Sequence, residues 1–309
     1  MDIHAAERSD AMSTHVVAVA NQKGGVGKTT TAVNLSACLV EQRRRVLLID
    51  LDPQANATSA LGLEKKAGQS LYGPLLGRGG LREHIRPTAY RRFDIVPSEI
   101  DLAGAEVDIV MAADYLHRLR RLLEPVVAEN LYDFIFIDCP PSLGVLTING
   151  LTAAHSVLIP LQCEYFALEG LGSITGVIEQ LKASGANPDL KIDGILMTMF
   201  DKRTRLAQQV VEEVYHHFPN EIYESLIPRN VRLSEAPSYG KPVIVYDTHS
   251  IGAAAYRRLA VEFLRRHESA PIAGEMERLV AESTTASVNA ETGPQCPAEE
   301  NSGRATVGP

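Results

Sequence analysis

Short apolar runs alternate with segments of helical period along most of this chain. The runs are rich in Val, Ile and Leu and have the length of strands. This alternation is typical of parallel strands that are buried on both faces and joined by crossover helices. The sequence therefore predicts an α/β fold, with a single doubly wound, mostly parallel sheet and helices on both faces. The expected strands are Val16–Ala20, Val46–Asp50, Phe93–Pro97, Phe134–Asp138, Ser156–Leu161, Gly194–Met199 and Ile222–Ile227.

The plainest helical period lies in residues 204–217, where Leu206, Val210 and Val214 recur every four residues. We expect one domain over residues 15–268. Residues 1–14 are expected to be flexible, and Met12 is an alternative start to Met1. From residue 270 onward the chain has no aromatic residue and is rich in small and polar residues. Such a segment cannot bury enough apolar surface to offset the entropy of ordering, so residues 269–309 are predicted to be a disordered acidic tail.

Composition narrows the protein class. Hydrophobic residues make up 45% of the chain and charged residues 22%, as in a globular protein. The apolar runs are much shorter than the roughly 20 residues of a membrane-spanning helix. The N-terminus lacks the features of a secretory signal. We therefore expect a cytoplasmic protein that does not associate with a membrane. The four cysteines, Cys38, Cys139, Cys163 and Cys296, are widely spaced and are interpreted as reduced thiols.

The net charge of −8 argues against a surface that is basic all over. Residues 270–309 hold six acids and two bases, so about half of this charge is local. Any contact with DNA must therefore use a local basic patch.

A glycine-rich loop directly follows the first expected strand. Residues 21–30 read NQKGGVGKTT and lead into a helix that has Ala32, Leu35 and Leu39 on one side. Glycines let several N–H groups converge on phosphate oxygens, and the helix N-terminus adds partial positive charge. We expect Lys28 to hold the β- and γ-phosphates and the Thr29 hydroxyl to bind Mg²⁺. The predicted nucleotide-binding residues of the loop are Lys23, Gly24, Gly25, Val26, Gly27, Lys28, Thr29 and Thr30.

Acidic residues end two further strands. Asp50 and Asp52 lie in LLIDLDPQ, and Asp138 ends the apolar run FIFID. Ligands of open α/β sheets collect at the carboxyl ends of the strands. Asp138 suits a carboxylate that acts on Mg²⁺ through water, and Asp50 is a further candidate for the metal. The predicted cofactors are ATP and Mg²⁺, and the predicted reaction is γ-phosphoryl transfer to water.

The loop departs from the standard phosphate-loop pattern, because Gln22 stands where that pattern begins with Gly. KGGVGKT resembles the deviant Walker A motif of the ParA/MinD superfamily of P-loop ATPases. The resemblance implies that Lys23 reaches across a nucleotide sandwich dimer to the partner's phosphates. It also implies that Asp52 positions the attacking water, with Asp50 as support. The expected catalytic residues are thus Lys23, Lys28 and Asp52.

Four later stretches look like the chromosomal ParA, or Soj, branch: residues 138–144, 147–149, 162–170 and, most specifically, IPRNVRLSEAP at 227–237. The resemblance implies a loop by the adenine, with Pro228 and Asn230 as nucleotide contacts. It implies an ATP-bound homodimer that binds double-stranded DNA without sequence specificity on the nucleoid. It also implies a ParB-type centromere-binding partner, whose basic N-terminal peptide stimulates slow hydrolysis.

The DNA contacts are expected among basic residues late in the domain. Arg203, Arg229 and Arg232 are the main candidates, since guanidinium groups pair well with phosphate. Lys202 and Arg205 are secondary ones.

Two other readings of the same loop stay open. A MinD-like membrane-positioning ATPase would anchor through a basic amphipathic C-terminal helix, whereas this tail is acidic. An iron–sulfur carrier would need cysteines poised across the dimer axis, whereas Cys139 beside Pro140 more simply fills a buried turn. A tyrosine autokinase is disfavoured because the tail has no tyrosine. Chromosomal and plasmid cargo are not distinguished.

Overall fold

The structure, a computed structural model, describes residues 13–112 and 114–268. The chain divides into a unit that runs through Glu262 and a second one that starts at Phe263. Of the second unit, residues 263–268 are described, and they are helical. The predicted acidic tail at 269–309, Cys296 and residues 1–12 lie outside the described residues.

A seven-stranded sheet forms the centre of the described part of the first unit, in the order β3-β4-β2-β5-β1-β6-β7. Its neighbouring strands are parallel, except that β3 runs antiparallel to β4. This confirms the predicted doubly wound, mostly parallel sheet. The strands are β1 His15–Val19, β2 Val46–Asp50, β3 Arg86–Pro87, β4 Phe93–Val96, β5 Phe134–Asp138, β6 Ser156–Gln162 and β7 Lys191–Thr198.

The expected strand Ile222–Ile227 is wrong. The segment makes only isolated parallel bridges beside β7, at Ile222 and Pro228. Between them, the backbone N–H groups of Glu224 and Ser225 donate to the carboxylate of Glu262, at 2.8 and 2.9 Å. The carboxylate thus takes the N–H of Ser225, which a ladder continued from Tyr223 to Ile227 would direct to β7.

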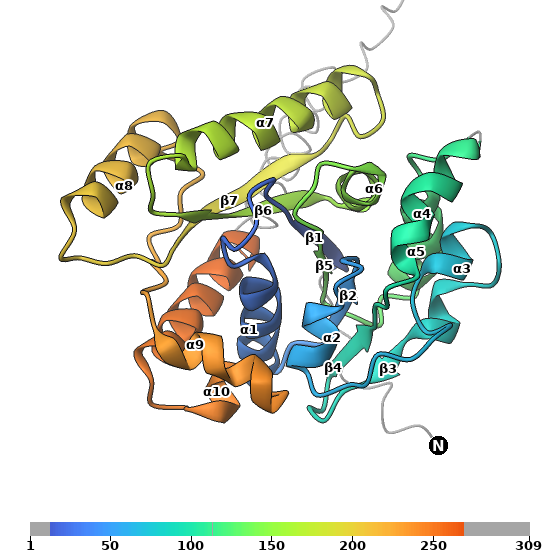
Figure 1. The fold of residues 1–309 in the computed structure, drawn as a ribbon, viewed down its shortest axis with the longest axis horizontal. Coiled ribbons are helices and arrows are strands. Elements are labelled where there is room, and N and C mark those ends of the chain that lie inside the picture. The colour runs from blue at the N-terminus through green and yellow to red at the C-terminus, as the bar shows by residue number, and fades with distance from the viewer. Residues whose placement is uncertain (1–12, 113, 269–309) are drawn as a thin grey trace, which may run out of the picture. The chain divides into compact units, whose positions relative to one another are not determined.

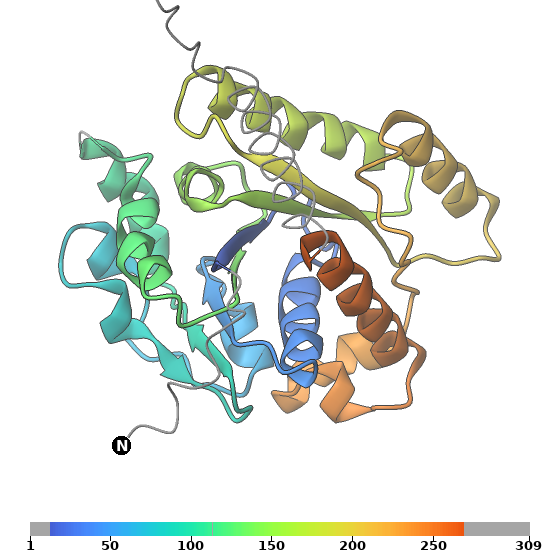
Figure 2. The ribbon, with the colours of Figure 1, turned by 180° about the vertical axis from the view of Figure 1, so that it is seen from behind.

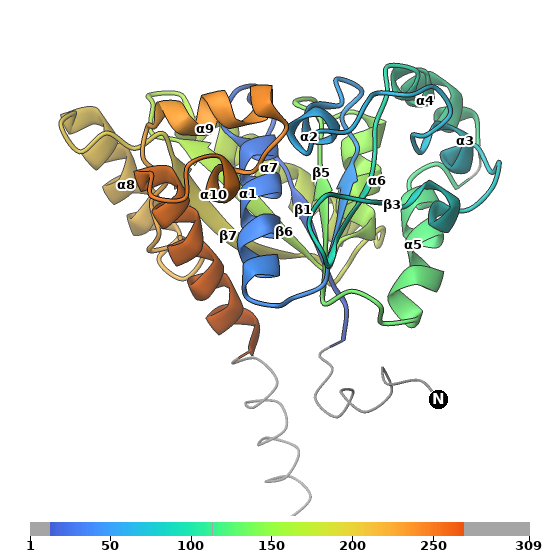
Figure 3. The same ribbon diagram turned by 90° about the horizontal axis from the view of Figure 1, so that it is seen from below.

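Helices cover both faces of the sheet (Figures 1 and 2), with α1 on one face and α6 and α7 on the other (Figure 3). The helix bounds are α1 Lys28–Glu41, α2 Asn56–Ala60, α3 Tyr72–Leu75, η2 Leu81–His84, α4 Leu102–Asp108, η3 Ile109–Met111, α5 Arg118–Ala128, α6 Val145–Ala153, α7 Ala167–Ala183, α8 Arg205–His217, α9 Val231–Glu235, η4 Ala236–Tyr239 and α10 Val243–Tyr246. A further helix begins at residue 251.

In α1 and α8, the apolar positions predicted from the helical period are for the most part buried. Ala32, Leu35 and Leu39 of α1 are fully buried against the sheet. In α8, Val210 and Val214 are buried, whereas Leu206 at the start of the helix remains 44% exposed.

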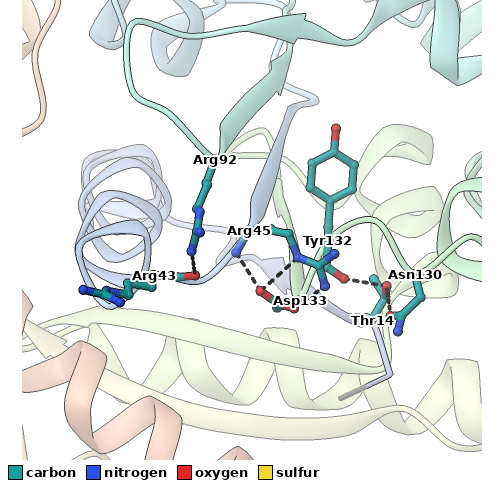
Figure 4. Close-up of polar contacts among 7 residues, drawn as sticks. All are labelled: Thr14, Arg43, Arg45, Arg92, Asn130, Tyr132 and Asp133. Carbon is teal, nitrogen blue, oxygen red and sulfur yellow. Dashed lines mark hydrogen bonds and ion pairs between the residues drawn. The ribbon is translucent and has the colours of Figure 1, made fainter. Parts of the chain in front are cut away.

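Polar contacts fix the beginnings of the central strands (Figure 4). The Asp133 carboxylate before β5 accepts from the backbone N–H of Arg45, at 2.7 Å, and from its guanidinium, at 2.6 Å. Arg92 before β4 donates to the carbonyl of Arg43, at 2.7 Å. Thr14 is buried and donates to the carbonyl of Tyr132, at 2.6 Å. These contacts hold β1, β2, β4 and β5 in the register that brings their carboxyl ends level.

Candidate nucleotide-binding site

The carboxyl ends of β1, β2 and β5 meet at one edge of the sheet. Asp138 at the end of β5 is in register with Val19 of β1 on one side and with Asp50 of β2 on the other. The glycine-rich loop leaves β1 at this edge, and Asp52 follows β2 there. The structure therefore brings together the loop and the three aspartates that the sequence placed at the ends of two different strands.

The loop has the backbone that its glycines permit. Gly25 and Gly27 have φ values of 76° and 93°, a left-handed conformation that side chains disfavour. Two buried polar residues fasten the loop. Asn21 donates to the carbonyl of Pro160, at 2.8 Å, and accepts from the N–H of Lys23, at 3.0 Å. Thr198 of β7 donates to the carbonyl of Val26, at 2.8 Å.

Sequence reasoning missed both anchors. Asn21 stands inside the motif and could have been suspected from its position. Nothing in the sequence marks Thr198, because its partner lies 172 residues earlier in the chain.

Lys28 is the buried cation of the site. It is 7% exposed, and its Nζ donates to the carbonyl of Lys23, at 3.1 Å. Burial lowers the pKa of Lys28, while Asp138, Cys139 and Asp52 act in the opposite direction. A buried ammonium with few partners gains strongly from a nearby polyanion, so this side chain is suited to phosphate.

Lys23, the second lysine of the loop, points to a different partner. Its Nζ forms an ion pair with Glu164 beyond β6, at 3.2 Å, and both side chains are partly exposed. Within one chain, Lys23 therefore contributes its carbonyl oxygen to Lys28, while its ammonium group lies at the surface beside Glu164.

Asp50 is fully buried and is held by the protein itself. One carboxylate oxygen accepts from the N–H and the hydroxyl of Thr58 in α2, at 2.8 and 2.7 Å. The other accepts from the N–H of Asp52, at 3.3 Å. Burial raises the pKa of Asp50 to about 6, although the bonds from Thr58 act against this shift. These hydrogen bonds connect the end of β2 to α2 through Asp50. Thr58 is therefore a site residue that the sequence analysis did not predict.

Asp138 has the opposite character. It is fully buried, and neither carboxylate oxygen has a hydrogen-bond partner. Burial raises the pKa of Asp138 well above its usual range, and Asp50 adds to the effect, while Thr29 and Lys28 oppose it. An unsatisfied buried carboxylate calls for an explanation such as an ion. Together with the nearby Thr29 hydroxyl it offers oxygen donors, so these residues fit Mg²⁺, with Asp138 acting through water. Asp50 fits the metal less well, since both of its oxygens are engaged.

Asp52 lies beside Asp50 and within electrostatic range of Lys28 and Asp138. It is 7% exposed, and one of its oxygens accepts from the N–H of Gln54, at 2.9 Å, so the side chain is held in place.

A cavity of about 450 Å³ opens beside the loop. It is lined by Gly27 and Thr30 of the loop, and by Pro228 and Asn230 of the later segment. Asn230 caps α9, because its side-chain oxygen accepts from the N–H of Arg232, at 2.9 Å. The amide NH₂ group is the remaining donor that Asn230 can offer a ligand. The structure thus joins the two segments that were predicted to contact the phosphates and the adenine.

The three candidate arginines differ in their surroundings. Arg203 makes a bidentate ion pair with Asp201, at 2.9 and 2.7 Å, and is 82% exposed. Arg232 pairs with Glu235, at 2.8 Å, and with Asp247, at 3.2 Å. Arg229 is exposed and forms no ion pair within the described part of the chain. The bridge between Phe200 and Pro228 brings Arg203 and Arg229 onto neighbouring segments.

The described cysteines Cys38, Cys139 and Cys163 are buried free thiols. Burial raises the pKa of each of them, as expected for reduced packing residues. Among residues 13–112 and 114–268, no helix has both the length and the apolar character needed to cross a membrane.

Comparison with known proteins places this site in a family. Residues 14–192 match the AAA_31 family, described as an AAA domain. The chain is 52% identical over 261 residues to the chromosome partitioning protein ParA of Myxococcus xanthus, covering 84% of this chain and 91% of that protein. It is 52% identical over 248 residues to the sporulation initiation inhibitor protein Soj of Bacillus subtilis, covering 80% and 97%.

A solved structure agrees in fold. The Mycobacterium smegmatis protein described as cobyrinic acid a,c-diamide synthase, with a bound ATP analog and magnesium, is 41% identical. The match has a TM-score of 0.72 and covers 83% of this chain and 97% of that one. The two partitioning proteins are more similar to this chain in sequence than this solved structure is. Neither of them is described as a membrane-positioning ATPase or as an iron–sulfur carrier. With its deviant phosphate loop, its strand-end aspartates and these relatives, the chain belongs to the ParA/Soj family of partitioning ATPases in the ParA/MinD superfamily.

Proposed function

We propose that this protein is an ATP-dependent DNA-partitioning switch. ATP and Mg²⁺ bind at the loop, and two ATP-loaded chains form a sandwich homodimer. The dimer binds double-stranded DNA without sequence specificity, and slow hydrolysis, stimulated by a ParB-type centromere-binding protein, resets it. The observation that carries this proposal is that the buried Lys28 at the start of α1 lies within electrostatic range of the buried, unpartnered Asp138 carboxylate at the end of β5.

Each group has a role in binding or hydrolysis. Lys28 and the loop N–H groups neutralise the β- and γ-phosphates, and Thr29 and Asp138 hold Mg²⁺ directly and through water. Asp52, fixed by Gln54, positions the attacking water. In the dimer, the Lys23 ammonium leaves Glu164 and binds the phosphates of the nucleotide on the second chain. Because phosphoryl transfer depends on positioning and charge neutralisation, a lone chain without that second lysine hydrolyses ATP slowly.

DNA binding follows from dimerisation. Arg203 and Arg229 lie on segments next to the cavity wall that carries Pro228 and Asn230, so nucleotide binding and the basic patch share one region of the fold. Two copies of a weak patch bind far better than one, because the second contact is intramolecular. The ATP form is therefore expected on the nucleoid and the ADP form free in the cytoplasm.

The test is DNA binding with ATP, with ADP and without nucleotide, on two duplexes of unrelated sequence. We expect tight binding only with ATP and Mg²⁺, with equal affinity for both duplexes. Lys28→Ala should remove the ATP effect, since the loop loses its buried cation. Equal DNA affinity in all three nucleotide states would refute the switch.

A further inference from the structure

The chain makes a tight turn directly after Asp52. The carbonyl of Asp52 accepts from the N–H of Ala55, at 2.8 Å, and its carboxylate accepts from the N–H of Gln54, at 2.9 Å. Ala55 has the left-handed conformation, with φ 52° and ψ 44°, and is fully buried. A residue with a β-carbon is strained in this conformation, and such strain persists only where the surroundings hold it. The turn that positions the Asp52 carboxylate therefore needs contacts from outside itself.

Both ends of this turn are held by neighbouring elements. At its start, the N–H of Asp52 donates to the Asp50 carboxylate, at 3.3 Å. At its end, the carbonyl of Ala55 accepts from the N–H and the hydroxyl of Ser59 in α2, at 3.2 and 3.1 Å. The carbonyl of Gln54, in the middle of the turn, takes part in neither set of bonds. A partner for this oxygen has to come from another segment.

Lys65 supplies that partner. Its Nζ donates to the Gln54 carbonyl, at 2.5 Å, from the loop of residues 62–70 that follows α2. The peptide group between Gln54 and Ala55 is planar, so it turns as a unit when the φ of Ala55 changes. A cationic donor on the oxygen of this group therefore opposes relaxation of the strained angle.

A buried carboxylate fixes the loop that carries Lys65. Glu99, three residues before α4, is 5% exposed. It accepts from the N–H of Gly68, at 3.0 Å, and from the N–H and the hydroxyl of Ser70, at 3.2 and 2.7 Å. An exposed lysine on an unrestrained loop would contribute little, because ordering both the loop and the side chain costs entropy. Here the backbone is already ordered by Glu99, so the bond from Lys65 costs only the order of its own side chain.

We propose that Lys65 is a positioning residue for hydrolysis. It holds the strained peptide group between Gln54 and Ala55, and it thereby keeps the Asp52 carboxylate where the attacking water binds. This role rests on the proposed function, which assigns the water to Asp52. Because Lys65 bonds to the turn after Asp52 and not to the phosphate loop, it acts on the rate of hydrolysis and leaves the affinity for ATP unchanged.

The first test measures kcat and the affinity for a fluorescent ATP analog in the full chain. Lys65→Met keeps the apolar stem but removes the donor, so kcat should fall at least fivefold while the affinity stays within twofold of the parent. Lys65→Arg retains a cationic donor and should keep at least half of the parental kcat. Lys66→Met is the matched control, because Lys66 in the same loop pairs with Glu64, at 3.2 Å, and should keep the parental kcat. Parental kcat in Lys65→Met, or an equal fall in Lys66→Met, would overturn the proposal.

Relief of the strain gives a readout that a merely structural role of Lys65 would not change. Glycine adopts the left-handed conformation readily, so in Ala55→Gly the turn no longer depends on the lysine. In the Ala55→Gly background, Lys65→Met should lower kcat less than twofold, against at least fivefold in the parent. This double-mutant cycle isolates the coupling between the two residues. An equal fall in both backgrounds would overturn the proposal, because Lys65 would then act elsewhere than on the turn.

Amide hydrogen exchange separates this proposal from the proposed function, since it needs no turnover. The N–H groups of Gln54 and Ala55 both donate to Asp52, so their exchange reports on the turn. Measured by mass spectrometry without nucleotide, their exchange should be at least threefold faster in Lys65→Met and unchanged in Lys66→Met. If the parent hydrolyses no ATP, the proposed function fails, and faster exchange in Lys65→Met alone still supports the hold of Lys65 on the turn. Parental exchange in Lys65→Met would overturn the proposal whether or not the chain hydrolyses ATP.

Discussion

The backbone of Gly240 lies directly against the backbone of Gly62. A β-carbon on Gly240 would stand 2.6 Å from the Cα of Gly62 and 3.0 Å from its nitrogen, and both residues have positive φ, 62° and 77°. Gly62 follows α2, whose Thr58 holds Asp50, and Gly240 follows η4, which continues the cavity wall after α9. This contact therefore joins the segment after Asp52 to the segment that carries the predicted adenine and DNA contacts.

Gly240→Ala should lower the thermal stability and the nucleotide affinity together. The methyl group both opposes a positive φ and forces the two backbones apart. Gly68→Ala is the matched control, because Gly68 also has a φ of 77° but has open space at its β-carbon position. The control should lose about 1 kcal/mol, a drop of roughly 2–4 °C in Tm, and Gly240→Ala should lose several times more. Equal losses in the two variants would show that the contact carries no constraint.

Gly24→Val should leave nucleotide binding intact and block the ATP dimer. Within one chain there is room for the change, since a β-carbon on Gly24 meets only Pro141, at 3.9 Å. The branched side chain would then crowd the loop where it approaches the second chain, beside Lys23. Light scattering with ATP is the measurement. A doubling of mass with ATP in this variant would place the dimer interface elsewhere.

Asp52→Ala and Asp138→Asn should separate hydrolysis from metal binding. Asp52→Ala removes the water-positioning carboxylate, so ATP binding and dimerisation should persist while turnover falls by at least a hundredfold. Asp138→Asn removes the unpartnered buried carboxylate, so the dependence of ATP affinity on Mg²⁺ should be lost. Titrations of a fluorescent ATP analog with and without Mg²⁺, followed by single-turnover assays, distinguish the two. Parental turnover in Asp52→Ala would make Asp50 the candidate instead.

The stability of the nucleotide-free protein should fall as pH rises through about 6. Burial raises the pKa of Asp50 to about 6 from 3.8, so the folded state favours the protonated acid. Its contribution to the free energy of unfolding is then full below about pH 4 and is lost between pH 4 and 6, on the order of 3 kcal/mol. Asp50→Asn should flatten this dependence, as measured by urea unfolding at pH 5 and pH 7.5. Parallel curves for the parent and the variant would contradict the assignment.

Reversal of Arg229 should weaken DNA binding more than reversal of Arg203 or Arg232. The latter two arginines already pair with carboxylates, whereas Arg229 forms no ion pair with any described residue. In Arg229→Glu the log–log salt slope should flatten by about 0.9 for each lost phosphate contact, on every DNA sequence. Arg91→Glu, an exposed arginine before β4 at the other end of the strands, is the charge-matched control. Parental affinity and slope after all three reversals would place the DNA surface elsewhere.

The sequence by itself determined the sheet and the chemistry of the loop. Strands buried on both faces are continuous apolar runs, so β1, β2, β4, β5, β6 and β7 are visible as such. Each acid that follows a run must lie at the carboxyl edge, which is why Asp50 and Asp138 could be placed without coordinates. Residues 222–227 do not form a strand because the carboxylate of Glu262 takes the Ser225 N–H that would continue the ladder beside β7. The local sequence pattern does not reveal a contact with a side chain so far along the chain.

Only the tertiary structure decided how these aspartates differ. Asp50 and Asp138 look alike in sequence, each ending an apolar strand. In the fold, Thr58 and the N–H of Asp52 engage both oxygens of Asp50, whereas neither oxygen of Asp138 has a hydrogen-bond partner. Only the tertiary structure likewise decided the Thr198 anchor of the loop and the contact between Gly62 and Gly240. Each depends on which distant segments meet, and pairing between segments is fixed by the packing of the whole chain rather than by local periodicity.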